Sequence, residues 1–141
     1  MSQPYGRNDL GLPVQGIVHS SDASSGVEIT LYDDDGSVRA LATSEKLAVD
    51  SYQLTSAAGG DCRLFLDTND DDAVDAGEEF ARGDVAANGT ISENFGENPF
   101  IGELGAKPHV IAPSGTVDVT FRGRILTPQP KTTAEKSHFV G

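Results

Sequence analysis

The chain has 141 residues, and its 22 Asp and Glu against 10 Lys and Arg give it a net charge of −12. This charge excludes nucleic acid and anionic membranes as direct partners, because both present negative groups that repel it. No apolar run approaches the ~20 residues of a membrane span, and the N-terminus lacks the apolar core of a secretory signal. The sequence therefore predicts one acidic domain, made in a cytoplasm and not exported by the usual route.

Short stretches in which apolar and polar residues alternate recur along the chain and predict β-strands. The first two stretches, 26–32 and 38–42, flank an Asp- and Gly-containing turn and are predicted to pair as a hairpin. Residues 47–54 form the next strand, in which a break in the alternation near Ser51 predicts a bulge. The remaining strands are expected at 62–66, 80–85, 90–95, 109–112 and 116–126.

The last of these stretches has the strongest alternation, with Val117, Val119 and Phe121 expected to face a core. Seven or eight short strands joined by Gly and Asp turns are typical of sandwiches and barrels. No stretch has apolar residues at helical spacing. We therefore predict an all-β fold, a single antiparallel β-sandwich or β-barrel that covers residues 16–127.

The two ends of the chain differ from this body. Residues 1–15 and 128–141 contain Pro and Gly and show little periodicity, which predicts extended arms. An isolated arm cannot offset its ordering cost of about 1–2 kcal/mol per residue, whereas a partner surface can supply the missing burial. The candidate partner contacts are the apolar and aromatic arm residues Tyr5, Leu10, Leu12, Phe139 and Val140. Packing of these residues on their own domain is the alternative.

An acidic run between two predicted strands carries the clearest chemical signal. Calcium binds about six to eight oxygen ligands, and an EF-hand loop supplies them at positions 1, 3, 5, 7, 9 and 12. The predicted side-chain ligands at these spacings are Asp67, Asn69, Asp71, Asp75 and Glu78, and Ala73 supplies its backbone carbonyl at position 7. Asp72 stands at position 6, where such loops have Gly, and Asp tolerates a left-handed backbone better than most residues. The alternative is a solvated acidic turn that binds no metal.

The flanks of this run alternate as strands, with Cys62, Leu64 and Leu66 on one face, whereas an EF-hand has helices there. The segment 64–78 resembles the EF-hand-like loop of the B-type repeats of bacterial surface adhesins, which are β-sandwich modules. The resemblance covers about a tenth of the chain. It implies calcium as a bound cofactor that makes the loop rigid.

The overall layout is similar to that of phage capsid decoration proteins, in its size, β-rich body, lack of disulfides and extended arms. Residues 105–119, from Gly105 to Val119, are also similar to such proteins. This resemblance implies a structural protein on the surface of a viral head, with the major capsid protein or other copies of the chain as partners and an oligomeric state. A calcium-stabilised module of a bacterial surface or secreted adhesive protein is the alternative.

Motifs of catalysis are not found in the sequence. His19, His109 and His138 have no metal-ligand spacing, and the single cysteine has no histidine near it in sequence. Phosphate-binding glycine loops and nucleophile elbows are missing as well. The tripeptide 82–84, Arg-Gly-Asp, matches the integrin-binding motif, but three-residue matches often arise by chance. We therefore predict a protein that is not an enzyme and has no catalytic residues.

Overall fold

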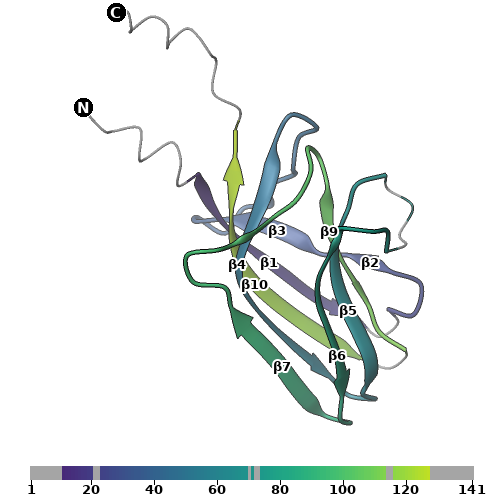
Figure 1. Ribbon diagram of the computed structural model, residues 1–141. Coiled ribbons are helices and arrows are strands. Elements are labelled where there is room, and N and C mark those ends of the chain that lie inside the picture. Colours follow the sequence, from purple (N-terminus) through teal and green to yellow (C-terminus); the bar gives the residue numbers. More distant parts are fainter. Residues whose placement is uncertain (1–10, 21–22, 70, 72–73, 114–115, 128–141) are drawn as a thin grey trace, which may run out of the picture.

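The computed structural model describes residues 11–20, 23–69, 71, 74–113 and 116–127. Ten strands in this part of the chain form two antiparallel sheets, with no closed barrel and no helix (Figure 1). The predicted all-β fold is confirmed, and of its two forms the structure adopts the β-sandwich. Within the described ranges there is no helix of the length and apolarity that crossing a membrane would require.

The larger sheet has six strands, in the order β3-β1-β10-β4-β7, with β8 paired to β4. Their bounds are β1 (Leu12–Ser20), β3 (Thr30–Asp33), β4 (Lys46–Ser56), β7 (Gly89–Asn94), β8 (Phe100–Ile101) and β10 (Val117–Leu126). β10 is the middle strand of the five, as its strict alternation of buried and exposed residues requires. Val117, Val119 and Phe121 face the core as predicted.

The smaller sheet has four strands, in the order β2-β9-β5-β6. Their bounds are β2 (Val27–Glu28), β5 (Gly60–Asp67), β6 (Glu79–Val85) and β9 (Lys107–Ile111). The chain changes sheets at the buried Ile29, whose N–H donates to the Pro108 carbonyl over 2.8 Å. The stretch predicted as one strand at 26–32 is therefore divided between the two sheets. The hairpin partner predicted at 38–42 is reduced to a single bridge, between Tyr32 and Val38.

Two bulges shape the sandwich. Arg122 pairs with Ser51 and Gly123 with Val49, so Asp50 is the extra residue of β4, which confirms the bulge predicted near Ser51. In the smaller sheet Phe80 is the extra residue of β6. The register shifts at this residue, and its ring enters the core. There it lies 6.0 Å from the ring of Tyr52, 5.6 Å from Phe100 and 6.5 Å from Phe121, all from the larger sheet. Phe80 thus joins the two layers.

β1 begins at Leu12, so residues 12–15, which the sequence assigned to the N-terminal arm, belong to the larger sheet. Leu12 pairs with Ile125 and is 45% exposed. The other candidate contacts of the arms lie outside the described residues: Tyr5, Leu10, Phe139 and Val140.

A partly buried ion pair holds the connection between β3 and β4. The guanidinium of Arg39 donates to both carboxylate oxygens of Glu45, over 3.0 and 2.8 Å, and the Ala42 N–H donates to the same carboxylate over 2.9 Å. The hydrogen bonds from Arg39 hold the pKa of Glu45 below its usual value.

This shift predicts a pH-dependent contribution to stability. Because the folded pKa of Glu45 is the lower one, its stabilisation is complete above the usual glutamate pKa of about 4.3 and is lost as the pH falls through the folded pKa. Glu45→Gln is expected to lower the free energy of unfolding by about 1–2 kcal/mol at neutral pH. Urea denaturation should show a smaller difference between the two proteins in acid. An equal loss at both pH values would contradict this role.

Candidate functional site

The acidic loop joins the end of β5 to the start of β6, and both flanking segments are strands, as predicted. The Leu66 N–H donates to the Glu78 carbonyl over 2.9 Å and closes the base of the loop. Gly77 has a φ of 85°, a backbone conformation that glycine adopts without strain. The two strands therefore fix both ends of the predicted ligand run.

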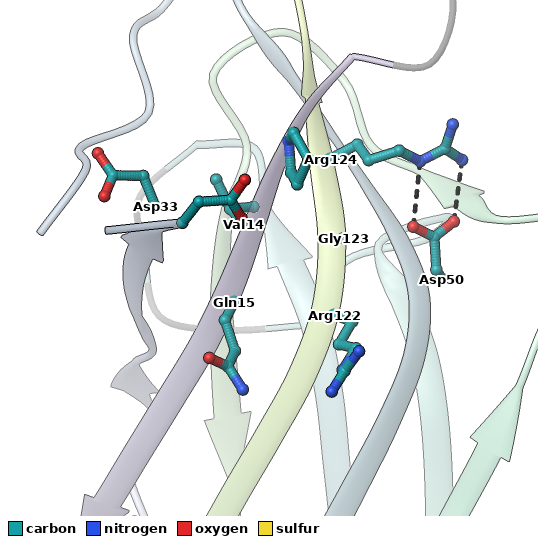
Figure 2. A pocket seen from close by; sticks show the side chains of 9 residues that line it. Val14, Gln15, Asp33, Asp50, Arg122, Gly123 and Arg124 are labelled. Carbon is teal, nitrogen blue, oxygen red and sulfur yellow. Dashed lines mark hydrogen bonds and ion pairs between the residues drawn. The ribbon is translucent and has the colours of Figure 1, made fainter. Parts of the chain in front are cut away.

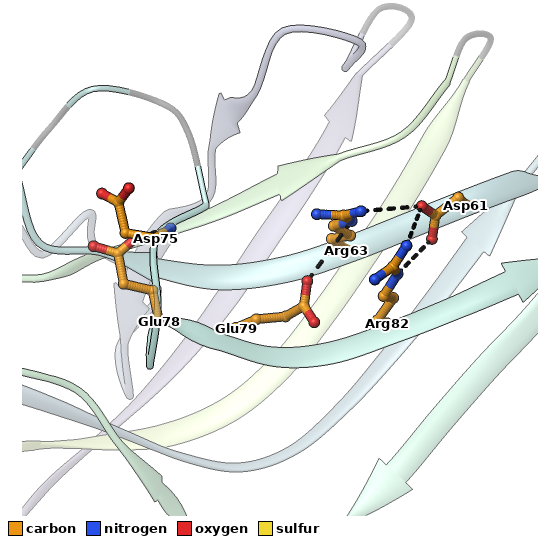
Figure 3. Close-up of polar contacts among 6 residues, drawn as sticks. All are labelled: Asp61, Arg63, Asp75, Glu78, Glu79 and Arg82. Atoms are coloured by element: carbon orange, nitrogen blue, oxygen red, sulfur yellow. Dashed lines mark hydrogen bonds and ion pairs between the residues drawn. The ribbon is translucent and has the colours of Figure 1, made fainter.

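Glu78 is the central acceptor of the loop. Its Oε2 accepts the Thr68 N–H over 2.8 Å, and its Oε1 accepts the Asp75 N–H over 2.9 Å. The Asn69 side-chain amide donates to Asp75 Oδ2 over 3.1 Å. Figure 3 shows the side chains of Asp75 and Glu78 close together on one side of the loop. Three of the predicted ligands are thus linked by hydrogen bonds.

Asp67, the first predicted ligand, lies beneath the loop and is fully buried. Its Oδ2 is 3.8 Å from Nε2 of the equally buried His109, whose Nδ1 lies 3.0 Å from the Lys107 carbonyl oxygen. The imidazole stacks on Phe65, with ring centres 5.4 Å apart. Each of these side chains alternates along its strand with core-facing residues, and none belongs to the main core. They are Phe65 and Asp67 on β5 and His109 on β9. We call these three residues the satellite cluster.

The sequence did not identify His109 as the neighbour of Asp67. The two meet because β9 pairs with β5, with His109 opposite Phe65 and Lys107 opposite Asp67. The alternation of β9 is the one signal that places His109 on the face away from the core. Pairing between distant strands cannot be derived from such local alternation.

The described residues give a partial view of the predicted metal site. Asn69, Asp75 and Glu78 meet in the loop, Asp67 lies at its base, and Asp71 is exposed. Ala73 lies outside the described residues. Within the described ranges, no three His, Cys, Asp or Glu side chains gather in a way that could hold a metal ion. Calcium binding therefore stays a prediction.

A charged network covers the outer face of β5 and β6 (Figure 3). Asp61 accepts from Arg82 over 3.1 Å at each of its two oxygens and from Arg63 over 3.4 Å, and these bonds, chiefly those from Arg82, lower the pKa of Asp61. Arg63 Nε also lies 3.7 Å from Glu79. The tripeptide 82–84 is therefore part of a paired strand, with its arginine bound to Asp61.

Cys62 lies within the core, and burial raises the pKa of its thiol. A buried thiol with a raised pKa forms little of the reactive thiolate. This residue therefore acts as a small apolar side chain of the core, as its position on the inward face of β5 indicates.

A shallow depression of about 440 Å³ lies on the outer face of the larger sheet, lined by residues of β1, β3, β4 and β10 (Figure 2). Arg124 crosses its rim and donates to Asp50 over 2.9 and 3.1 Å. Figure 2 shows Arg122 and Gln15 side by side on neighbouring strands, directed away from this ion pair.

No protein family model, curated protein or solved structure matches this chain.

Proposed function

We propose that the chain is a non-enzymatic structural protein of a large assembly, a decoration protein bound to the surface of a viral head. The observation that carries this proposal is the pairing of Leu12 with Ile125. β1 begins and β10 ends at the same end of the larger sheet, on neighbouring strands, so the first and last described residues of the domain lie side by side (Figure 1). Two segments that start together can contact the same neighbouring surface.

The ionisable side chains of the domain support a role in contact rather than catalysis. Glu78 binds backbone N–H groups, Arg124 binds Asp50, and Arg82 binds Asp61. Each of these groups holds a piece of the fold in place. The proposed partners are the major capsid protein or other copies of this chain, and repetition on a lattice would strengthen weak individual contacts.

The composition of the particle tests this proposal. Virions purified from the source of this sequence should contain the chain at a constant ratio to the major capsid protein. Because decoration proteins lie outside the shell, brief treatment of intact particles with an amine-reactive label should modify the chain. Particles that lack the chain, or that contain it only inside the shell, would contradict the proposal.

A calcium-stabilised β-module of a bacterial surface or secreted adhesive protein is the second candidate. The closed loop favours it, because Asn69, Asp75 and Glu78 meet there between two fixed strand ends. Calcium in this loop would bind the oxygens of the predicted ligands. Its role would be to stabilise the loop, since carboxylates brought together repel one another unless a cation lies between them.

Calcium is expected to raise the melting temperature of the protein. A ligand that binds only the folded state stabilises it by about 2.7 kcal/mol at a concentration one hundred times its dissociation constant. Calorimetric melting should therefore differ between excess calcium and excess chelator, and Asp75→Asn should reduce the difference. Asp34→Asn, in the acidic turn after β3, is the matched control and should leave it unchanged. Identical melting curves in calcium and chelator would show that the loop is a solvated turn.

A further inference from the structure

Two adjacent rows of outward side chains at the centre of the larger sheet contain no carboxylate. The strand registers align its outward side chains in rows. On the three central strands, two adjacent rows consist of Gln15, Arg122 and Ser51, and of Ile17, Thr120 and Gln53. Both rows continue onto β3 and β7 with Tyr, Thr, Asn and Ser. We call these two rows the carboxylate-free face.

The contrast with the other sheet is clear. The outer face of β5 and β6 carries Asp61, Glu79 and Asp84 together with two arginines. With a net charge of −12, two copies of the chain repel each other through most of their surfaces. The carboxylate-free face is where they can approach without placing acid against acid.

Arg122 lies at the centre of this face, on β10. Five arginines lie in the described part of the chain, and the other four each contact a carboxylate there. Arg122 is the one that forms no ion pair with any described residue. Its guanidinium, a planar group with five N–H donors, is suited to bind a carboxylate from another molecule.

That carboxylate is available on the same strand. Asp118 lies two rows from Arg122, with Thr120 midway between them. The Asp118 side chain is 56% exposed, and one of its oxygens contacts His19. The second oxygen has room for a further donor.

A two-fold axis relates these positions. Suppose that this axis lies in the contact plane, perpendicular to the strands, and crosses β10 at Thr120. Arg122 of one copy then lies over Asp118 of the other, and the reverse contact forms by symmetry. Ile17, which pairs with Thr120 and is 41% exposed, then lies over the same residue of the second copy. The carboxylate-free face, together with Asp118 in the adjoining row, is therefore complementary to itself in charge and in its apolar centre.

We propose that the carboxylate-free face joins two copies of the chain in a symmetric dimer, held by two reciprocal Arg122–Asp118 ion pairs. The two larger sheets stack at about 10 Å, the usual spacing of packed sheets. Two twisted sheets move out of alignment as the distance from the axis grows. Both ion pairs lie close to the axis, so the twist changes their geometry less than that of contacts farther away. This dimer does not depend on a viral partner, so it stands or falls separately from the proposed capsid role.

Sedimentation velocity on the full chain tests the dimer. The wild-type protein should sediment as a dimer as its concentration rises, and high salt should weaken the association. Arg122→Asp and Asp118→Arg should each raise the dissociation constant by about tenfold or more, because each places like charges together twice in every dimer. Arg82→Asp makes the same charge change on the other sheet and should leave the dimer intact.

An equal mixture of the two variants gives the sharpest result. In a mixed dimer each substituted side chain meets the opposite charge, so fluorescently labelled Arg122→Asp should dimerise with unlabelled Asp118→Arg. This rescue also shows that both variants are folded. A wild-type chain that stays monomeric at all concentrations would overturn the proposal, as would single variants that dimerise as tightly as the wild type.

Discussion

Phe121→Ala is expected to lower the free energy of unfolding by about 3–5 kcal/mol, because it leaves a cavity where a large buried ring contacts both layers. The Phe121 ring is 1% exposed and lies 6.5 Å from that of Phe80 in the opposite sheet. The free energy of unfolding of an ordinary domain is about 5–15 kcal/mol, so this loss is a large fraction of the total. Urea denaturation followed by circular dichroism measures it directly.

Gly16 provides the control for this prediction. It pairs with Phe121, and a Cβ at this position would overlap the Phe121 ring. Gly16→Ala alone should therefore cost about 1–3 kcal/mol through overpacking. In the Phe121→Ala background the same change should cost nothing or be stabilising, since the added methyl enters the cavity. Additive losses would mean that the ring does not occupy the space above Gly16.

His109→Ala is expected to lower the free energy of unfolding by about 2–5 kcal/mol, because it removes a fully buried ring and leaves a cavity in its place. The substitution removes the stack on Phe65 and the imidazole that faces the Asp67 carboxylate at 3.8 Å. Thermal melting in the presence of chelator would isolate this effect from any metal bound to the loop above.

His19→Ala is the matched control, because His19 also contacts an aspartate, Asp118. The two side chains are 72% and 56% exposed, so their pairing is screened by water and its loss should change stability little. A His109→Ala protein that is as stable as the His19→Ala protein would show that the satellite cluster contributes nothing to the fold.

Local alternation was sufficient to predict β10 and β4, two of the three central strands of the larger sheet. The stretch at β10 alternates without interruption, and the parity break in β4 marks its bulge. β1 was missed because Gly16 occupies an inward position where an apolar residue would have completed the pattern. The reason for glycine there is the ring of Phe121, which comes from a strand far away in the sequence.

The same distinction applies to the candidate site. The ligand spacing of the acidic loop is local, so the positions of Asn69, Asp75 and Glu78 could be predicted from the sequence alone. The approach of Asp67 to His109 depends on the register between β5 and β9. The carboxylate-free face likewise depends on the order and register of five strands, and no single strand indicates it.

Attachment of the chain to its assembly through the terminal arms is the central claim of this account. Particles stripped of the chain should bind it again when the purified protein is added, and quantitative mass spectrometry of the washed particles measures the amount bound. Chains that lack residues 1–11 or 128–141 should keep the circular dichroism spectrum of the β-sandwich but bind in much smaller amounts. Undiminished binding of a folded chain that lacks both segments would contradict the claim and assign the contact to the domain itself.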